Sequence, residues 1–153
     1  MKTIIITGTP GTQNEIMTKQ LIFNDKNSIV ILFPEIWTEK FSNTALHPEE
    51  IIKELEKRYN EAYKKEKDIV LVTYSCIAVN SLRIFIAKHD LNDNKFYQII
   101  KKDDSNNITT EVISIDNNGK FQTKLHNKGI LNTLSGQLFK LLDFSVVFCE
   151  VYK

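Results

Sequence analysis

The first structural element of this chain is a short run of β-branched residues that stops at a glycine. Thr3–Thr7 is such a run, and Gly8 ends it. The pattern predicts a buried parallel strand. Gly8–Thr12 then predicts a tight loop. Gln13–Phe23 has roughly the spacing of a helix, with apolar residues at Ile16, Met17, Leu21 and Ile22.

The alternation of strand and helix continues to residue 88. Ser28–Phe33 and Ile69–Thr73 are short apolar runs that predict two further buried strands. Pro48 opens a predicted helix that extends to about Lys67. Its apolar stripe consists of Ile51, Ile52, Leu55, Tyr59, Ala62 and Tyr63. Ile77–Lys88 predicts another helix, so the fold class is α/β, with a mainly parallel sheet flanked by helices.

The pattern changes in the C-terminal part of the chain. Lys95–Lys101 and Ile108–Ile115 alternate in character and predict a strand pair, followed by a tight turn at Asn117-Asn118-Gly119. A helix over Gly129–Leu142 and a last strand over Phe144–Tyr152 complete the prediction. We expect a single domain over residues 1–153, with an α/β core at 1–94 and a small α+β appendage on the same core at 95–153.

Composition excludes some classes of function. The net charge of +1 gives no bulk electrostatic case for nucleic acid or an anionic membrane as partner. No apolar run approaches the length of a membrane span, and the apolar N-terminal stretch is too short for a signal peptide, so we expect a cytoplasmic protein. Cys76 and Cys149 lie in apolar segments and are expected to be free buried thiols.

Residue usage points to the type of genome. The chain has only two arginines, Arg58 and Arg83, beside many lysines, asparagines and isoleucines. These residues use AT-rich codons, which favours an AT-rich bacterial or phage gene. For a phage gene, the expected location is the cytoplasm of the host.

The strand, glycine-rich loop and helix at the N-terminus have the order of a phosphate-binding P-loop, in which backbone N–H groups and the helix dipole hold the phosphates. The full motif reads G-x-x-x-x-G-K-[ST]. Gly8 opens it here, but Gln13 replaces the second glycine, Asn14 the phosphate-binding lysine and Glu15 the magnesium-binding hydroxyl. Loss of a buried charge contact of this kind weakens binding about 30-fold or more.

Two interpretations of this loop stay open. In the first, the loop is a strand-to-helix turn that stabilises the fold. In the second, it keeps a residual nucleotide site for ATP and magnesium, formed by Gly8, Thr9, Pro10, Gly11, Thr12 and Asn14.

Five short motifs follow along the chain in a defined order. They are Pro34-Glu35-Ile36, Leu46-His47-Pro48, Thr73-Tyr74-Ser75, Asn80-Ser81-Leu82-Arg83 and Asp116-Asn117-Asn118-Gly119-Lys120-Phe121. In order and spacing, the segment from Ile29 to Phe121 resembles the C-terminal lobe of the ABC/SMC-like ATPases of the OLD type (overcoming lysogenisation defect). The resemblance also takes in the first strand and its loop. It implies a P-loop NTPase-like fold.

The resemblance also implies that the residues of ATP hydrolysis have been replaced. Leu32 stands where the family has the metal-binding acid of Walker B, and Phe33 where it has the catalytic acid or its neighbour. Tyr74 stands where the family has a histidine that senses the γ-phosphate. Glu35 is the one matching acid, and it lies beyond the catalytic pair. Hydrolysis needs magnesium, charge neutralisation and an oriented water, and the residues for these tasks are not in register.

We therefore expect no catalytic residue, no metal and no cofactor. The remnant Walker B and switch positions are Pro34, Glu35, Thr73, Tyr74 and Ser75. Intact relatives dimerise across their nucleotide faces. The resemblance thus implies a protein that binds a protein partner, either a related ATPase that it regulates or for which it acts as a decoy, or a second copy of itself. The alternative is a residual nucleotide-binding protein or weak NTPase with a rearranged P-loop.

Other candidate sites are weaker. Thr133–Gln137 is similar to the ABC signature but lies after the Walker B position, so a helix with small residues explains it. His47, His89 and His126 have no cysteine or carboxylate at metal-ligand spacing. Ser75 has no visible histidine and aspartate partners for a hydrolase triad. A nucleic-acid accessory protein has only the lysine content in its favour.

Overall fold

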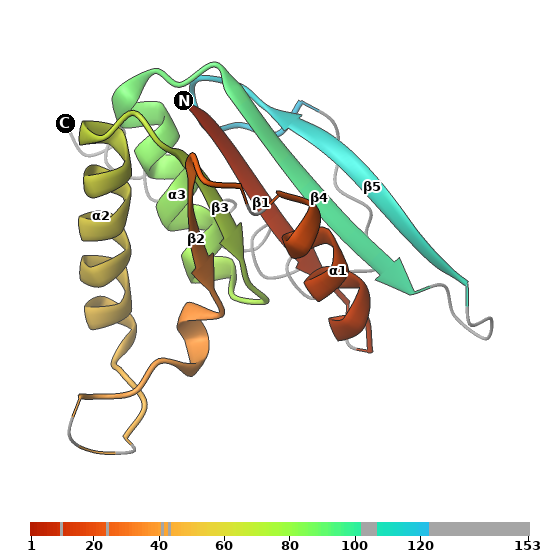
Figure 1. The fold of residues 1–153 in the computed structure, drawn as a ribbon, viewed down its shortest axis with the longest axis horizontal. Helices are drawn as coiled ribbons and strands as arrows, with labels where there is room; N and C mark the ends of the chain where they lie inside the picture. Colours follow the sequence, from red (N-terminus) through yellow and green to blue (C-terminus); the bar gives the residue numbers. More distant parts are fainter. Residues whose placement is uncertain (10, 24, 41, 43, 102–106, 123–153) are drawn as a thin grey trace, which may run out of the picture.

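The computed structural model describes residues 1–9, 11–23, 25–40, 42, 44–101 and 107–122. They contain a five-stranded sheet with the order β2-β3-β1-β4-β5 (Figure 1). The first four strands are parallel, and β5 is antiparallel to β4. The prediction of a mainly parallel α/β sheet is confirmed. The strands are β1 (Lys2–Gly8), β2 (Ser28–Leu32), β3 (Asp68–Val72), β4 (Asp93–Lys101) and β5 (Ile108–Ile115).

Helices cover both faces of this sheet. They are α1 (Gln13–Phe23), the short 3-10 helix η1 (Pro34–Ile36), α2 (Pro48–Lys64) and α3 (Cys76–His89). Helix α1 packs on one face, and α2 and α3 lie side by side on the other (Figure 1). The predicted bounds of α1, α2 and α3 agree with the structure to within a few residues, and η1 was not predicted. The helix predicted over Gly129–Leu142 and the strand predicted over Phe144–Tyr152 lie outside the described residues.

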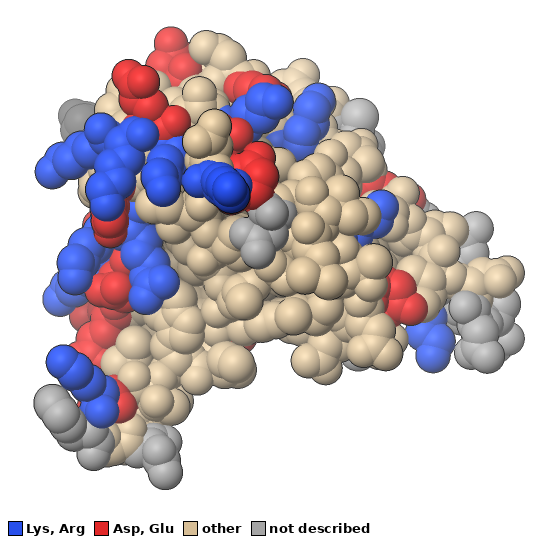
Figure 2. Space-filling model, viewed as in Figure 1, with Lys and Arg blue, Asp and Glu red and all other residues tan. Residues whose placement is uncertain are grey.

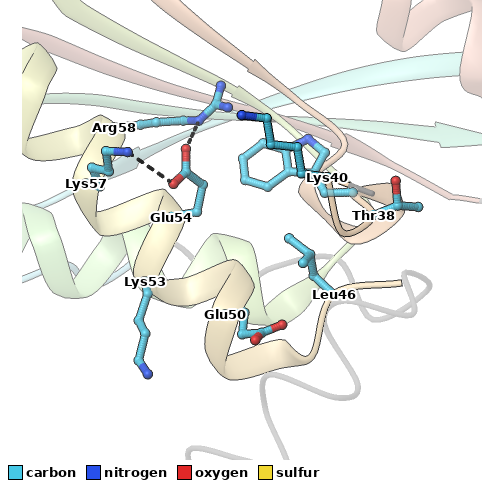
Figure 3. A pocket seen from close by; sticks show the side chains of 9 residues that line it. Thr38, Lys40, Leu46, Glu50, Lys53, Glu54, Lys57 and Arg58 are labelled. Carbon is cyan, nitrogen blue, oxygen red and sulfur yellow. Dashed lines mark hydrogen bonds and ion pairs between the residues drawn. The ribbon is translucent and has the colours of Figure 1, made fainter. Parts of the chain in front are cut away.

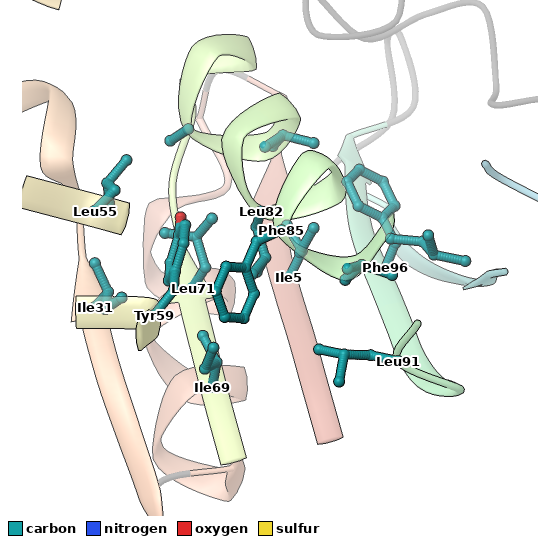
Figure 4. Packing of buried hydrophobic residues seen from close by; sticks show 14 of the residues in the cluster. Ile5, Ile31, Leu55, Tyr59, Ile69, Leu71, Leu82, Phe85, Leu91 and Phe96 are labelled. Carbon is teal, nitrogen blue, oxygen red and sulfur yellow. The ribbon is translucent and has the colours of Figure 1, made fainter. Parts of the chain in front are cut away.

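The main core lies between the sheet and the two helices α2 and α3. Alternate residues of a strand point to opposite faces, so Ile5 and Leu71 face α2 and α3, whereas Ile6 faces α1. Tyr59 and Leu82 bring the two helices onto the sheet (Figure 4). Burial of each such side chain contributes about 1.5–3 kcal/mol.

Helix α1 uses a different stripe from the one predicted. Ile16 and Gln20 are buried and Phe23 is half-buried, whereas Leu21 and Ile22 are 69% and 66% exposed. Positions 16, 20 and 23 follow the i, i+4, i+7 spacing of one helix face. The helix is rotated so that the stripe through Gln20 meets the sheet, and the apolar positions Leu21 and Ile22 noted in the sequence face away from it.

Strand β2 was predicted to be buried, and this prediction was wrong for most of its residues. It pairs with β3 and forms one edge of the described sheet, so most of its residues are only half-buried. The strand ends because Phe33 takes a left-handed conformation with φ 41°. Trp37 then donates a hydrogen bond from Nε1 to the carbonyl oxygen of Leu32 at 3.2 Å, which occupies one acceptor at the end of the strand.

Strands β4 and β5 belong to the main sheet rather than to an appendage. Strand β4 runs parallel to β1, and the two are paired from Lys2 with Asp93 to Gly8 with Ile99. Helix α3 connects β3, on one side of β1, to β4, on the other side of β1, so that β4 can pair with β1. The predicted division at residue 94 therefore does not mark a structural boundary.

Two smaller expectations concern the membrane and the thiols. Among the described helices, none combines the length and the apolar character that crossing a membrane requires. Cys76 is a free, half-buried thiol at the first residue of α3, and Cys149 lies outside the described residues.

Tyr59 makes the stability of the fold sensitive to alkaline pH. Burial raises the pKa of its hydroxyl well above the usual value; the hydrogen bond with Ser81 lowers it and Glu56 raises it. The unfolded chain loses this proton near pH 10 and the folded chain keeps it, so the free energy of unfolding falls as the pH rises above about 10.

We predict that in Tyr59→Phe the free energy of unfolding decreases less steeply above about pH 10 than in the unmodified protein. Urea titrations at increasing pH measure this dependence. At pH 7 the variant loses about 1 kcal/mol, because the hydrogen bond between Tyr59 and Ser81 at 3.1 Å is removed. Equal slopes for the two proteins above pH 10 would contradict the assignment.

Candidate functional site

The sequence-predicted residues gather at the carboxyl edge of the sheet, where β1, β2 and β3 end. Strand β1 leads into α1 on one face, and its neighbour β3 leads into α3 on the other. Open α/β sheets bind ligands where neighbouring strands connect to opposite faces. The ends of β1 and β3 are therefore the place to look for a site.

The loop after β1 is short and closed. Thr9–Thr12 connects Gly8 to the first residue of α1. The hydroxyl of Thr12 donates to the carbonyl oxygen of Thr9 at 2.6 Å, and both threonines are buried. A Cβ on Gly8 would collide with Thr12 Oγ1 and lie 2.7 Å from Ile16 Cδ1. The Thr12 side chain thus packs tightly against Gly8, inside the turn.

This loop is also tied to β4. The Thr9 N–H donates to the carbonyl oxygen of Ile99 at 3.0 Å, and the Lys101 N–H donates to Thr9 Oγ1 at 3.1 Å. Gly11 has φ 87°, a conformation that favours glycine. A Cβ at Gly11 would lie 3.9 Å from Lys101 Nζ, so the ammonium group of this lysine stands beside the loop.

Lys101 was missed as a candidate from the sequence. It lies far from Gly11 along the chain, and only the pairing of β1 with β4 brings it there. The residue in the lysine position of the motif, Asn14, has an exposed side chain in the first turn of α1. Its backbone carbonyl accepts a hydrogen bond from Thr18 Oγ1 at 2.9 Å. Pro10 lies outside the described residues.

Glu35 is the centre of a second set of contacts. One carboxylate oxygen accepts a hydrogen bond from the Thr73 hydroxyl at 2.7 Å, and the other accepts one from the Tyr74 N–H at 2.6 Å. Thr73 Oγ1 also accepts a hydrogen bond from the Ser75 N–H at 2.9 Å. The carboxylate thereby ties η1 to the segment between β3 and α3.

Tyr74 connects this set to α1. Its ring stacks on that of Phe33 with 5.6 Å between the ring centroids. Burial raises the pKa of the Tyr74 hydroxyl, and the negative charges of Glu35 and then Glu15 raise it further. The structure therefore brings Glu35, Thr73, Tyr74 and Ser75 together, with Glu15 near them at the start of α1.

Two motif residues have capping roles. Ser75 is the N-cap of α3, and its hydroxyl accepts a hydrogen bond from the Ala78 N–H at 3.4 Å. His47 is the N-cap of α2 and forms a capping box with Glu50. Pro48 follows at the first helical position, where its missing N–H has no cost. Local helix geometry thus accounts for Ser75 and for His47-Pro48.

Arg83 and the turn at Gly119 lie far apart in the sequence but in contact in the structure. Arg83 Nε donates to the Gly119 carbonyl oxygen at 2.6 Å, and its guanidinium lies 4.3 Å from the centroid of the Phe121 ring. Burial lowers the pKa of Arg83 to about 10, and Asp116 opposes this shift. A Cβ on Gly119 would collide with the backbone of Arg83, so these residues fasten the turn after β5 to α3.

The donor set at this edge does not fit magnesium triphosphate. The carboxylate of Glu15 would repel phosphate, and the Thr12 hydroxyl is engaged with Thr9. Within the described residues, no group of three His, Cys, Asp or Glu side chains could hold a metal ion. The hydrogen bonds of Thr12 and Glu35 hold the loops of this edge together.

Comparisons with protein-family models, with curated proteins and with solved structures found no match for this chain.

We predict that Glu35→Ala destabilises the fold by about 1–3 kcal/mol, because the Thr73 hydroxyl and the Tyr74 N–H lose their acceptor. Urea unfolding at pH 7 measures the effect. Glu39→Ala is the matched control: Glu39 is exposed and accepts a hydrogen bond only from the Ser42 hydroxyl among the described contacts, so we expect a change below about 0.5 kcal/mol. Equal losses in both variants would refute a structural role for Glu35.

Proposed function

We propose that this chain is an ATPase-like protein without hydrolytic activity, which acts by binding a protein of related fold. The partner is a second copy of the chain, or an intact ATPase that the chain regulates or for which it acts as a decoy. The proposal starts from the resemblance to OLD-type ATPases, whose nucleotide faces form dimers. The corresponding face here is the carboxyl edge of the sheet.

The observation that carries the proposal is the apolar character of this edge. Ile36 is 71% exposed, and Leu32 and Ile77 are also exposed, next to the stacked rings of Phe33 and Tyr74. Figure 2 shows that the middle of the lower rim of the molecule, near the ends of the strands, is mostly uncharged, whereas Lys, Arg, Asp and Glu gather over α2 and along the upper edge. Exposed apolar clusters of this kind mark protein interaction sites.

The polar groups at the edge support the same proposal. Glu35 is engaged with Thr73 and Tyr74, so its carboxylate is held inside the protein rather than offered to a ligand. A nucleotide face needs charge that neutralises phosphate and binds magnesium. An apolar edge with internally bonded polar groups suits contact with another protein better.

We predict that the chain self-associates through this edge. Sedimentation velocity at increasing concentration should show a dimer, and Ile36→Asp should shift the protein to monomer, since a charge placed in an apolar interface is desolvated. Leu21→Asp is the matched control, because Leu21 is 69% exposed and lies in the last turn of α1, away from the carboxyl edge. Equal dissociation by both variants would rule out this edge as the interface.

The same pair of variants tests the second type of partner. Ile36→Asp should abolish, and Leu21→Asp should retain, co-purification of an ATPase of the resembled family from a bacterial lysate. A chain that is monomeric at all concentrations and recovers no such ATPase would overturn the proposed function.

One observation favours residual nucleotide binding as a second candidate function. Lys101 Nζ lies beside Gly11, so β4 supplies a positive charge near the loop from which the motif's own lysine is missing. Backbone N–H groups at the start of α1 would complete a weak phosphate site.

Calorimetry with ATP and GTP, with and without magnesium, separates the two candidates. Under the main proposal we expect no binding tighter than about 100 μM. Tighter binding that is lost in Lys101→Ala, but retained in Lys95→Ala on the same strand, would support the second candidate instead.

A further inference from the structure

A groove of about 780 Å³ lies beside α2, outside the carboxyl-edge site (Figure 3). One wall is α2, and the other is the segment that joins η1 to α2. The residues on which the argument rests are Trp37, Leu46, Lys53, Glu54, Lys57 and Arg58.

Backbone hydrogen bonds hold the wall opposite α2. Thr38 and Ala45 form an antiparallel bridge, and the Leu46 N–H donates to the Trp37 carbonyl oxygen at 3.0 Å. The Glu39 N–H donates to the Thr44 carbonyl oxygen at 2.9 Å. The groove is therefore preformed, which lowers the entropic cost of binding.

The groove offers apolar surface. The guanidinium carbon of Arg58 lies 4.6 Å from the centroid of the Trp37 ring, which fixes the indole against α2. Trp37 and Leu46 are both half-buried and line the groove. A half-buried tryptophan beside an arginine is the kind of pair that dominates binding energy at protein interfaces.

The charge of the groove is positive. Lys40, Lys53, Lys57 and Arg58 line it against Glu50 and Glu54, four cationic groups against two carboxylates, a net of +2. Both carboxylates have partners within the protein. Glu50 accepts a hydrogen bond from the His47 N–H in the capping box, and Glu54 lies 3.2 Å from Arg58 and 3.8 Å from Lys57 (Figure 3).

We propose that this groove binds an acidic segment of a protein partner that carries a large apolar side chain. The apolar side chain would lie against Trp37 and Leu46, and the carboxylates would face Lys53 and Lys57. This inference rests on the proposed function in one respect only, which is that the bound partner is a protein.

A peptide fits this groove better than a nucleic acid. The chain as a whole carries only +1, so it lacks the broad positive surface that a phosphate backbone binds. The apolar groups in the groove match an aliphatic or aromatic side chain, and the lysines at its rim match carboxylates. This combination of an apolar anchor and complementary charge gives specificity to protein recognition.

The chain's single tryptophan makes the proposal directly measurable, because Trp37 lies in the groove. A short synthetic peptide of alternating glutamate and leucine is titrated into the full chain while the emission of Trp37 is recorded. We expect a saturable change in emission with a Kd of about 10–100 μM, weakened by added salt. The same peptide with lysine in place of glutamate should bind at least about tenfold more weakly.

Variants locate the binding on α2. The double variant Lys53→Glu and Lys57→Glu should weaken binding of the glutamate peptide by about tenfold or more, because two attractive charges become repulsive. Lys64→Glu reverses one such charge in the last turn of α2, outside the groove. Because a surface charge at that distance is screened by salt, this variant should change the affinity less than about twofold. Helical circular dichroism confirms that the variants remain folded.

Four outcomes would overturn the proposal. They are an unchanged Trp37 emission at saturating peptide, equal binding of the lysine peptide, an equal effect of Lys64→Glu and of the double variant, and tighter binding of single-stranded oligothymidylate than of the glutamate peptide. Failure here is distinguishable from failure of the proposed function. If the chain dimerises but does not bind the peptide, only the proposal for the groove fails. If the chain stays monomeric but binds the peptide, only the proposal of self-association through the carboxyl edge fails.

Discussion

Strand β1 holds this fold together, because it is hydrogen-bonded to β3 on one side and to β4 on the other. Its side chains are buried on both faces, with Ile5 toward α2 and α3 and Ile6 toward α1. A strand in this position has to be short, apolar and β-branched. Its central place also puts Gly8 in the middle of the carboxyl edge, between the ends of β3 and β4.

The polar groups at this edge hold its loops in place. Thr12 closes the loop on Thr9, and Glu35 joins η1 to the end of β3. Buried polar groups generally need partners, and the protein supplies them for Thr12 and Glu35, whereas the buried Thr7 Oγ1 on β1 has no hydrogen-bond partner among the described residues. Ile36, Leu32 and Ile77 are exposed at the same edge, and these apolar side chains are why protein contact is the function we propose.

Charge in this nearly neutral chain is unevenly distributed. Lysines, arginines and carboxylates gather over α2, and the carboxyl edge is mostly uncharged (Figure 2). The net charge of +1 is therefore an average over two surfaces of different chemistry. The apolar edge suits a flat, uncharged partner surface, and the basic groove beside Trp37 suits an acidic segment.

The sequence alone determined the class of fold and nearly every element of the part of the chain that the structure describes. Periods of two and 3.6 residues are local properties, and Pro48 and Gly119 mark a helix start and a turn within a few residues. It also indicated that Pro34, Glu35, Thr73, Tyr74 and Ser75 belong together. Only the tertiary structure decided the strand order, the edge position of β2, the pairing of β4 with β1 and hence the place of Lys101 beside Gly11. These features depend on which strands are neighbours in the sheet and on how α1 is rotated about its axis. A local sequence pattern determines neither of them.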